Sequence, residues 1–532
     1  MVSRAIYRSD DIEFHYARFG GIREAILGGQ FPIKYYNGWC YGGGYFSPLF
    51  YGDIFLIPFV LLSFLGIPLK TCFFIFIYVI YFAFWTVMYF LAKKYLCSDV
   101  WAILCATIFT TTNYMFYEIF GRAALGEAVA IIFYLVLLIG IYNLLFENYS
   151  KPWLLLVAFL GILFSHMTTL FFAIVTMLLV VLFNAKKLLG DKKFWIKSSL
   201  ILGIFLIIGL YFIVSFIEMY FADNYSITHS EYSKSKIPSK FAQDFFDIIG
   251  VTPKFNIGVV LIFAILLRLI IIKIKYEKTE IKTIDKFLII SSILLFMVSK
   301  IFPWKLFDSI LGTIQFPWRL NFIIAILLSI VVAWEIKIIS KSHIKWASVF
   351  IGVMLILLLI DNSCIVFKSK WQERELNSYS NKYFYEWYLF GTNVYDFKDR
   401  NIYDNSQNAV EYERKEHTTD LNFVADENDD YYIVPIVCYK GYEATLVDEN
   451  GQTSNLVIER CDNGMIKIFT NKQKGKVYLH YAGTTIQNVT FWISFMGTLV
   501  LIVGGTTYAI VKKKRKHNAE NIECEPLTAT SA

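Results

Sequence analysis

Charged residues are scarce in this sequence. They make up 17% of its 532 residues, whereas a typical soluble protein carries about a quarter. Hydrophobic residues reach 56% and aromatic residues 18%, a composition that suits lipid-facing helices with aromatic belts at both membrane interfaces. The low charge therefore argues against a soluble enzyme and favours an integral membrane protein surrounded by lipid.

Motifs of several common function classes are also missing. The sequence has no Cys-x-x-Cys pair and no Cys/His spacing typical of a metal centre. Glycines 42–44 lack the strand–loop–helix context and the lysine of a P-loop, so we do not expect an ATP site there. The net charge of +7 comes from lysines and arginines in short loops between apolar runs. This excess indicates membrane orientation and does not suggest nucleic-acid binding.

Apolar runs long enough to cross a bilayer recur along the chain. A spanning helix needs about 20 apolar residues. Residues 153–184 form one apolar run interrupted by Ser165 and His166, so two short or tilted helices are expected there. The predicted spans are 71–92, 99–117, 124–145, 153–167, 168–184, 197–219, 254–273, 286–302, 320–337, 345–367 and 489–511.

Clusters of basic residues orient these spans. The run Lys512–Lys516 follows the last span and is a strong cytoplasmic signal. The lysines near 93–94, 186–197, 273–286 and 337–345 fall on the same side when the spans are counted backward. We therefore predict a first extracytoplasmic loop with juxtamembrane helices (1–70), a multi-span helical domain (71–367), an extracytoplasmic β-rich domain (368–488), a final span (489–511) and a basic cytoplasmic tail (512–532).

The first loop contains one ambiguous segment. Residues 49–67 look like a further span, which would place residues 1–48 in the cytoplasm. Asp53 and Pro58 interrupt the run and favour a helix that lies along the membrane instead. The charge pattern alone leaves both readings open.

The polar domain 368–488 has the pattern of a β protein. Segments 431–437, 443–448 and 476–481 read as strands, and Asn-Gly pairs at 450–451 and 463–464 read as hairpin turns. We expect a small β-sandwich. Its two cysteines, Cys438 and Cys461, could form a disulfide if the domain lies outside the cell.

Charged residues near the start of the chain suggest a site. Asp11, His15 and Arg18 are spaced four and three residues apart, which places them on one face of a helix. A carboxylate beside an imidazole and a guanidinium can serve as a base, a metal site or a phosphate site. The alternative is a solvated amphipathic helix with ordinary ion pairs.

Further candidates lie at the predicted outer ends of later spans. Arg122 and Glu127 are charges that are costly near a membrane unless they are paired or used; the alternative is interfacial snorkelling. Arg319, in the segment Gln315-Phe316-Pro317-Trp318-Arg319, could hold a phosphate headgroup, or the segment could be an aromatic-belt anchor. His166 is a further candidate for substrate binding, although a lone histidine in an apolar run is more often a hydrogen-bonding residue between helices than a catalyst.

These motifs together resemble a known family. The segments that carry the resemblance are Asp11-x-x-Phe14-His15-x-x-Arg18, Gly29-Gln30-Phe31-Pro32, Gly44-Tyr45-Phe46, Phe50-Tyr51-Gly52-Asp53, Gly121–Glu127, Ser165-His166, Gln315–Arg319 and, in the β-rich domain, Pro435, Gly441-Tyr442 and Tyr481–Thr484. Their order is similar to that in GT-C superfamily glycosyltransferases, and most similar to the bacterial YfhO-like branch. The resemblance runs through nearly all of the chain.

The resemblance implies a fold and an activity. It implies a GT-C-like bundle of α-helices in the membrane, a polyprenyl-phosphate sugar as donor, and transfer to a cell-envelope glycopolymer or lipid on the outer face. By motif position Asp11 is the expected base, with Asp10 as the alternative. An outer position of Asp11 requires residues 49–67 to lie along the membrane.

Two further expectations concern charge and the chain start. We expect Arg122 and Arg319 to hold the leaving phosphate, and His15 and Glu127 to complete a site for a divalent cation such as Mg²⁺ or Mn²⁺. Members of this superfamily begin with a spanning helix before the acidic loop. Only ten residues precede Asp11 here, so we expect that the start is either truncated or has lost that helix.

Two other function classes remain. A transporter or lipid flippase would show inverted repeats and broken helices with charges near the middle of the membrane, and neither is evident. A non-catalytic envelope assembly protein, acting through the β-rich domain, would show scattered polar residues and no cavity. Convergence of Asp11, Arg122 and Arg319 in one outer cavity that opens to lipid would favour the transferase over both.

Overall fold

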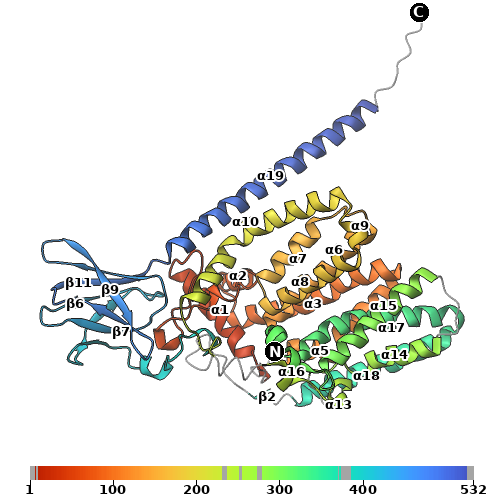
Figure 1. The fold of residues 1–532 in the computed structure, drawn as a ribbon, viewed down its shortest axis with the longest axis horizontal. Coiled ribbons are helices and arrows are strands. Elements are labelled where there is room, and N and C mark those ends of the chain that lie inside the picture. Colours follow the sequence, from red (N-terminus) through yellow and green to blue (C-terminus); the bar gives the residue numbers. More distant parts are fainter. Residues whose placement is uncertain are drawn as a thin grey trace, which may run out of the picture.

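A computed structural model describes residues 6–7, 10–229, 237–250, 255–271, 278–368, 371–372 and 385–523. Figure 1 shows a bundle of helices, a β-rich domain beside the region of α1 (Ile12–Leu27) and α2 (Ile57–Leu61), and a long C-terminal helix that extends away from the bundle. The longer helices are α3 (Leu69–Leu96), α4 (Asp99–Thr111), α6 (Leu125–Phe146), α7 (Trp153–Leu163), α8 (Met167–Phe183), α10 (Lys192–Ala222), α14 (Val259–Ile271), α15 (Lys278–Val298), α17 (Asn321–Ser342), α18 (Ile344–Lys368) and α19 (Thr485–Glu523).

Each predicted span overlaps one of these helices. Six are long and apolar enough to cross a membrane: α3, α6, α10, α17 with the turn before it, α18 and α19. These helices fit a multi-pass membrane protein, as the composition predicts. The other five are shorter or, in α15, carry charged residues over their first half. The total of eleven crossings therefore stays a prediction.

The apolar run 153–184 is divided as expected. Helix α7 ends at Leu163 and α8 begins at Met167. His166 has an extended backbone with φ −158°, which is incompatible with one continuous helix. The Ser165 hydroxyl donates a hydrogen bond to the Gly161 carbonyl. The prediction of two short helices here is confirmed.

Helix α17 lies at the centre of the bundle, whereas α10 and α19 lie at its edge. Most residues of α17 are buried, and it packs against α4, α14, α15 and α18. Helices α10 and α19 pack on each other, and the Ser494 hydroxyl donates to the Ile207 carbonyl at 2.9 Å. Their remaining faces expose large apolar side chains such as Leu200 and Val500. Such faces suit contact with lipid.

Residues 49–67 do not form a long helix. They contain α2 (Ile57–Leu61) and a 3₁₀ turn (Leu62–Leu65) that ends at Gly66, whose φ of +86° is left-handed. Nine helical residues span roughly 15 Å, about half of a hydrocarbon core. This segment is therefore too short to cross a bilayer as a helix. Such a short helix is compatible with the expected position of residues 49–67 along the membrane surface.

Helix α1 (Ile12–Leu27) belongs to the first loop, is largely buried, and packs against α2 and α3. The remaining helices are short and connect the larger elements. They are α5 (Asn113–Phe116), α9 (Ala185–Leu188), α12 (Pro238–Phe241), α13 (Phe245–Ile249) and α16 (Trp304–Leu311).

The β-rich domain is antiparallel, as predicted. Strands β8 and β9, and β9 and β10, form hairpins across the two predicted Asn-Gly turns. A separate two-stranded pair joins β1 (Ile6–Tyr7) to β2 (Trp371–Gln372). The domain strands are β3 (Ile402–Asp404), β4 (Ala409–Val410), β5 (Tyr412–Arg414), β6 (Leu421–Ala425), β7 (Tyr431–Val437), β8 (Tyr442–Val447), β9 (Thr453–Arg460), β10 (Met465–Phe469) and β11 (Gly475–Tyr481).

Hydrogen bonds join the nine domain strands in one order, β4-β3-β7-β10-β9-β8-β11-β6-β5. The two edge strands, β4 and β5, are separated in sequence by Glu411 alone. The sheet must therefore curl until its edges meet. A ring contact between Phe423 of β6 and Tyr432 of β7, with centroids 4.8 Å apart, lies inside this curl. A sandwich of two separate sheets stays a prediction.

Aromatic contacts fix the β-rich domain to the first loop. Phe50 stacks on Trp387 with ring centroids 4.0 Å apart, and Phe46 stacks on Tyr439 at 4.2 Å. The Val437 amide donates to the Gly43 carbonyl at 2.8 Å. The first loop thus links the start of the chain, the bundle and the domain.

The two domain cysteines are not bonded to each other. Cys438 and Cys461 are free thiols, and the Cys438 thiol lies against the Glu459 carbonyl. The disulfide considered from the sequence is absent from the structure.

Candidate functional site

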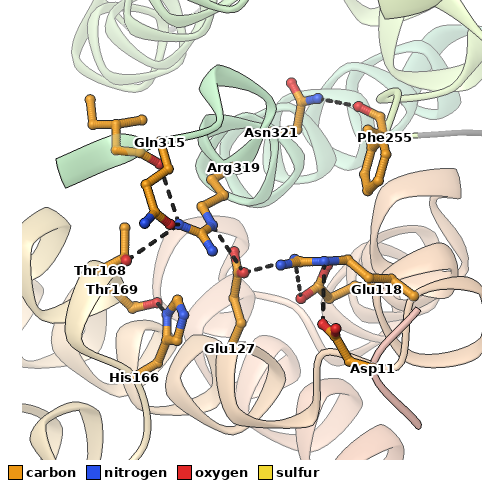
Figure 2. Close-up of polar contacts among 12 residues, drawn as sticks. Asp11, Glu118, Glu127, His166, Thr168, Thr169, Phe255, Gln315, Arg319 and Asn321 are labelled. Carbon is orange, nitrogen blue, oxygen red and sulfur yellow. Dashed lines mark hydrogen bonds and ion pairs between the residues drawn. The ribbon is translucent and has the colours of Figure 1, made fainter. Parts of the chain in front are cut away.

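Charged side chains from distant segments meet in one chain of ion pairs (Figure 2). Arg122 donates to Glu127 Oε2 at 2.8 Å and to both Glu118 oxygens at 3.1 and 3.2 Å. Arg122 Nε lies 3.8 Å from Asp11 Oδ2. Arg319 Nε lies 3.4 Å from the same Glu127 oxygen. We call these five residues the ion-pair chain.

Irregular backbone places these residues. A π-helical turn covers Tyr117–Gly121, and Ala123 has a left-handed φ of 56° just before α6 begins. The Asp11 amide donates to the Arg122 carbonyl at 2.9 Å, which fixes the start of α1 on this turn. Gln315 also has a left-handed φ, of 57°. Backbone strain at non-glycine residues is typical of functional sites.

The Arg319 guanidinium is held on several sides. Its Nη1 donates to Gln315 Oε1 at 3.0 Å and contacts the Ile314 carbonyl and Thr168 Oγ1, both at 3.3 Å. Figure 2 shows Thr168 and Gln315 on the side of Arg319 away from Asp11. Arg319 lies over Phe316, and Arg122 lies over the Trp318 ring at 4.7 Å. Both arginines are thus preorganised by hydrogen bonds and cation–π contacts.

Burial differs along the ion-pair chain. The Glu127, Arg319 and Arg122 side chains are 1%, 7% and 10% exposed, whereas Asp11 is 41% exposed. Asp11 is therefore the member that solvent and a ligand can reach most easily.

The protein environment shifts the pKa of the Asp11 carboxyl toward neutral pH. Surrounding protein raises the pKa of Asp11 to about 6, although the Arg122 charge opposes this rise. Burial also raises the pKa of Glu118, against the pull of Arg122. A neutral Glu118 would leave two carboxylates, Asp11 and Glu127, beside the two guanidiniums. Such a balance lowers the penalty of burying these charges.

A second polar network lies within the first loop. Arg18 is fully buried and donates to Asp53 Oδ1 from Nε at 3.1 Å and from Nη2 at 2.6 Å. The Tyr36 hydroxyl donates to the other Asp53 oxygen at 2.5 Å. Arg18 Nη1 lies 3.3 Å from His15 Nδ1. Because its fork is occupied by Asp53, Arg18 holds the first loop together in this structure.

Tyr51 lies between the two networks. Its ring is 4.4 Å from the Arg18 guanidinium carbon, and its centroid lies 6.2 Å from the His15 ring and 6.3 Å from the His166 ring. A Cβ atom at Gly126 would come within 1.8 Å of the Tyr51 hydroxyl oxygen. Glycine at 126 therefore permits Tyr51 to reach the first turn of α6.

His15 and His166 each lie beside one polar neighbour within the protein. Burial, followed by the charge of Arg18, holds the pKa of His15 well below its usual range, so Nδ1 accepts from Arg18 and Nε2 carries the proton. His166 Nδ1 is 2.9 Å from Thr169 Oγ1. Among the described residues, no group of three His, Cys, Asp or Glu side chains could hold a metal ion. His15 and Glu127 thus do not form the predicted cation site with a third ligand.

The structure brings together most predicted site residues. Asp11, Arg122, Glu127, Gln315 and Arg319 belong to the ion-pair chain or contact it directly. Asp10 is exposed beside it. Sequence reasoning missed Glu118, Tyr36 and Thr168. It named Tyr51 and Asp53 in a segment that carries the resemblance but gave them no role.

Comparisons with known proteins add little about function. No family model matches this sequence. A protein of Lactococcus lactis subsp. cremoris, described as uncharacterized, is 27% identical over 320 residues. The match covers 56% of this chain and 51% of the relative, so the chain spans about half the length of the protein it matches. The similarity establishes neither a family nor an activity.

Proposed function

We propose that this protein is a membrane glycosyltransferase that moves a sugar from a polyprenyl-phosphate donor to a cell-envelope acceptor on the outer face. The observation that carries the proposal is the convergence of Asp11, Arg122 and Arg319 through Glu127. These residues come from three segments that the sequence resemblance marks separately. A carboxyl with a pKa near neutrality beside two guanidiniums provides a base and an anion-binding group together.

The distribution of charge along α6 supports an outer location. Its first turn holds Glu127 of the ion-pair chain, and its other end is met by Lys94, which pairs with Glu147, and by Lys187, which donates to the Leu145 carbonyl. Twenty-two residues of helix span roughly 33 Å, close to the thickness of a hydrocarbon core.

Lysines at helix ends favour the cytoplasmic side. We therefore propose that the ion-pair chain faces outward, that the β-rich domain is extracytoplasmic, and that the C-terminal tail is cytoplasmic. Membrane lipid would surround the bundle, with about eleven crossings in all.

In the proposed reaction, the Asp11 carboxylate accepts the proton of an acceptor hydroxyl. The freed oxygen attacks the anomeric carbon of the donor sugar and forms the new C–O bond with inversion. The bond from that carbon to the phosphate oxygen breaks, and polyprenyl phosphate leaves with one additional negative charge. Arg122 and Arg319 would stabilise that charge. Asp10, exposed and adjacent, is the alternative base.

The resting ion pairs set a condition on this mechanism. Both arginines contact Glu127 in the described structure, so a donor phosphate has to replace a carboxylate contact. Arg122 also contacts Glu118. If Glu118 is neutral, a phosphate can replace that contact at lower cost, because a neutral carboxyl is a weaker partner of a guanidinium than a carboxylate is. A divalent cation, Mg²⁺ or Mn²⁺, stays a prediction without assigned ligands.

Purified protein in proteoliposomes with a radiolabelled polyprenyl-phosphate sugar tests the proposal. We expect label to appear on a product that is chemically distinct from the donor, and only in vesicles that contain the protein. Label that crosses the bilayer on an unchanged donor would identify a flippase instead. A donor that is neither moved nor consumed, with envelope extract supplied as acceptor, would favour a non-catalytic assembly role.

A further inference from the structure

A cavity of about 450 Å³ lies between the first loop and the β-rich domain. Its size is in the range of pockets that bind small molecules. None of the ion-pair chain lines it, so it is separate from the proposed catalytic centre. Its lining residues are Asn37, Gly38, Gly42, Arg400, Arg414, Lys415, Glu416, His417 and Thr418.

The cavity lining carries excess positive charge. Within the described part of the chain, Arg400, Arg414 and Lys415 form no ion pair with a carboxylate. Two carboxylates flank His417: Glu24 Oε2 contacts its Nδ1, and Glu416 Oε1 lies 3.6 Å from its Nε2. Burial lowers the pKa of Arg414, and the nearby charge of Arg400 lowers it further. Cations without carboxylate partners favour binding of an anion.

Arg414 is fixed in position by the backbone around it. Its Nε donates to the Thr418 carbonyl at 2.8 Å, and its Nη2 donates to the Gly42 carbonyl at 2.6 Å. Gly42 has a φ of +103°, and a Cβ there would come within 2.9 Å of Arg414 Nη1. Glycine thus allows the guanidinium to approach the first loop closely. A preorganised guanidinium loses little entropy when it binds an oxyanion.

A neutral polar group completes the lining. Asn37 Oδ1 is buried, and it has no hydrogen-bond partner within the residues that the structure describes. A buried acceptor without a partner costs free energy that a ligand hydroxyl could recover. Arg400 and His417, on the domain side, both have left-handed φ angles, of 58° and 60°. These angles hold the rim in a defined, strained shape.

We propose that this cavity binds an anionic sugar, a saccharide unit that carries a phosphate or carboxylate group. Arg400, Arg414 and Lys415 contact the anionic group, and Asn37 accepts a hydrogen bond from a sugar hydroxyl. This assignment rests on the proposed function in one respect: it gives the β-rich domain the role of holding an anionic acceptor glycan. Binding itself needs no transfer reaction.

Calorimetric titration of the purified full chain in detergent tests the proposal with four probes: glucose 6-phosphate, galacturonate, glucose and inorganic phosphate. We expect glucose 6-phosphate or galacturonate to bind, and the tighter of the two identifies the anionic group. We expect glucose and phosphate alone to bind at least about tenfold more weakly, since each lacks half of the contacts. Affinity should also fall as salt is added.

Exposed residues provide the matched variants. The double variant Arg400→Ala/Lys415→Ala removes two exposed cations, and we expect about tenfold or greater loss of affinity. The control Lys472→Ala/Lys474→Ala removes the same charge from the β10–β11 turn, and we expect less than about a twofold change because the residues are distant from the ligand. Equal binding by both variants, equal binding of glucose, or no binding of either anionic sugar would overturn the proposal.

A third variant separates this proposal from the catalytic one. Asp11→Asn leaves the cavity lining unchanged, so we expect wild-type affinity for the anionic sugar. Binding without any transfer activity in the wild type would refute the proposed function and leave the cavity assignment standing. Transfer activity without binding of either anionic sugar would refute the cavity assignment and leave the proposed function standing.

Discussion

Glu127 joins the two arginines of the ion-pair chain, and the substitution Glu127→Gln should destabilise the protein strongly. The carboxylate is 1% exposed and lies 2.8 Å from Arg122 and 3.4 Å from Arg319. Glutamine keeps the shape but removes the negative charge. Two buried guanidiniums would then face each other with Asp11 and Glu118 as their remaining carboxyls.

The magnitude follows from the geometry. Each charge pair at about 4 Å is worth about 4 kcal/mol at an effective dielectric of 20. Desolvation offsets much of this energy, and breaking a buried pair from one side typically costs about 3–5 kcal/mol. Glu118 should lose its proton more easily in the variant, because the repelling charge of Glu127 is gone. We therefore expect a loss near the lower end, about 3 kcal/mol.

Denaturant unfolding of the purified protein in detergent measures this loss, and Glu335→Gln is the matched control. Glu335 is also a fully buried glutamate in a bundle helix, α17, but neither of its oxygens has a hydrogen-bond partner among the described residues. We expect this control to change stability by about 1 kcal/mol or less. Equal losses in the two variants, or no loss in Glu127→Gln, would refute the electrostatic account of the ion-pair chain.

Three further predictions follow from the same contacts. Because burial raises the pKa of Asp11 to about 6, its carboxyl is protonated at lower pH, and transfer should rise tenfold per pH unit below 6 and level off above it; a flat rate between pH 5 and 7 would contradict this. Asp53→Asn should lower the free energy of unfolding by about 3–5 kcal/mol, since it leaves the buried Arg18 charge unpaired; a loss below about 1 kcal/mol would refute the pairing. In a background whose eight native cysteines are replaced by serine, a membrane-impermeant maleimide should label Lys398→Cys but not Lys192→Cys in intact cells, and the opposite pattern would invert the proposed topology.

The positions of the helices could be predicted because a run of apolar residues is recognised from consecutive sequence alone. All eleven predicted spans overlap a helix, and the break at Ser165 and His166 is visible in the sequence as a polar interruption. Helix length was less predictable. The predicted span 99–117 ends as a helix at Thr111, where a short helix and a π-helical turn follow. Sequence periodicity does not distinguish these from a continued α-helix.

The site was predictable only in part, because its members meet through the fold. Arg122 and Arg319 stand out as charges at the ends of apolar runs, and Asp11 is indicated by its spacing from His15 and Arg18 and by the family resemblance. Glu118 is not among the predicted site residues, although it lies four residues before Arg122, a spacing typical of an ion pair on a helix. Arg18 and Asp53 are 35 residues apart, and no local pattern shows that they pair. The curl of the β-rich sheet depends likewise on strand order, which alternation does not encode.

The most direct test of the central claim is the initial rate of sugar transfer by Asp11→Asn in proteoliposomes that contain a labelled polyprenyl-phosphate sugar, with envelope extract as the acceptor. Asp10→Asn serves as the matched control, since Asp10 is the exposed neighbour. We predict that Asp11→Asn lowers the rate by about 100-fold or more, as loss of a general base does, while Asp10→Asn stays near the wild-type rate. Transfer by Asp11→Asn at the wild-type rate would contradict the account.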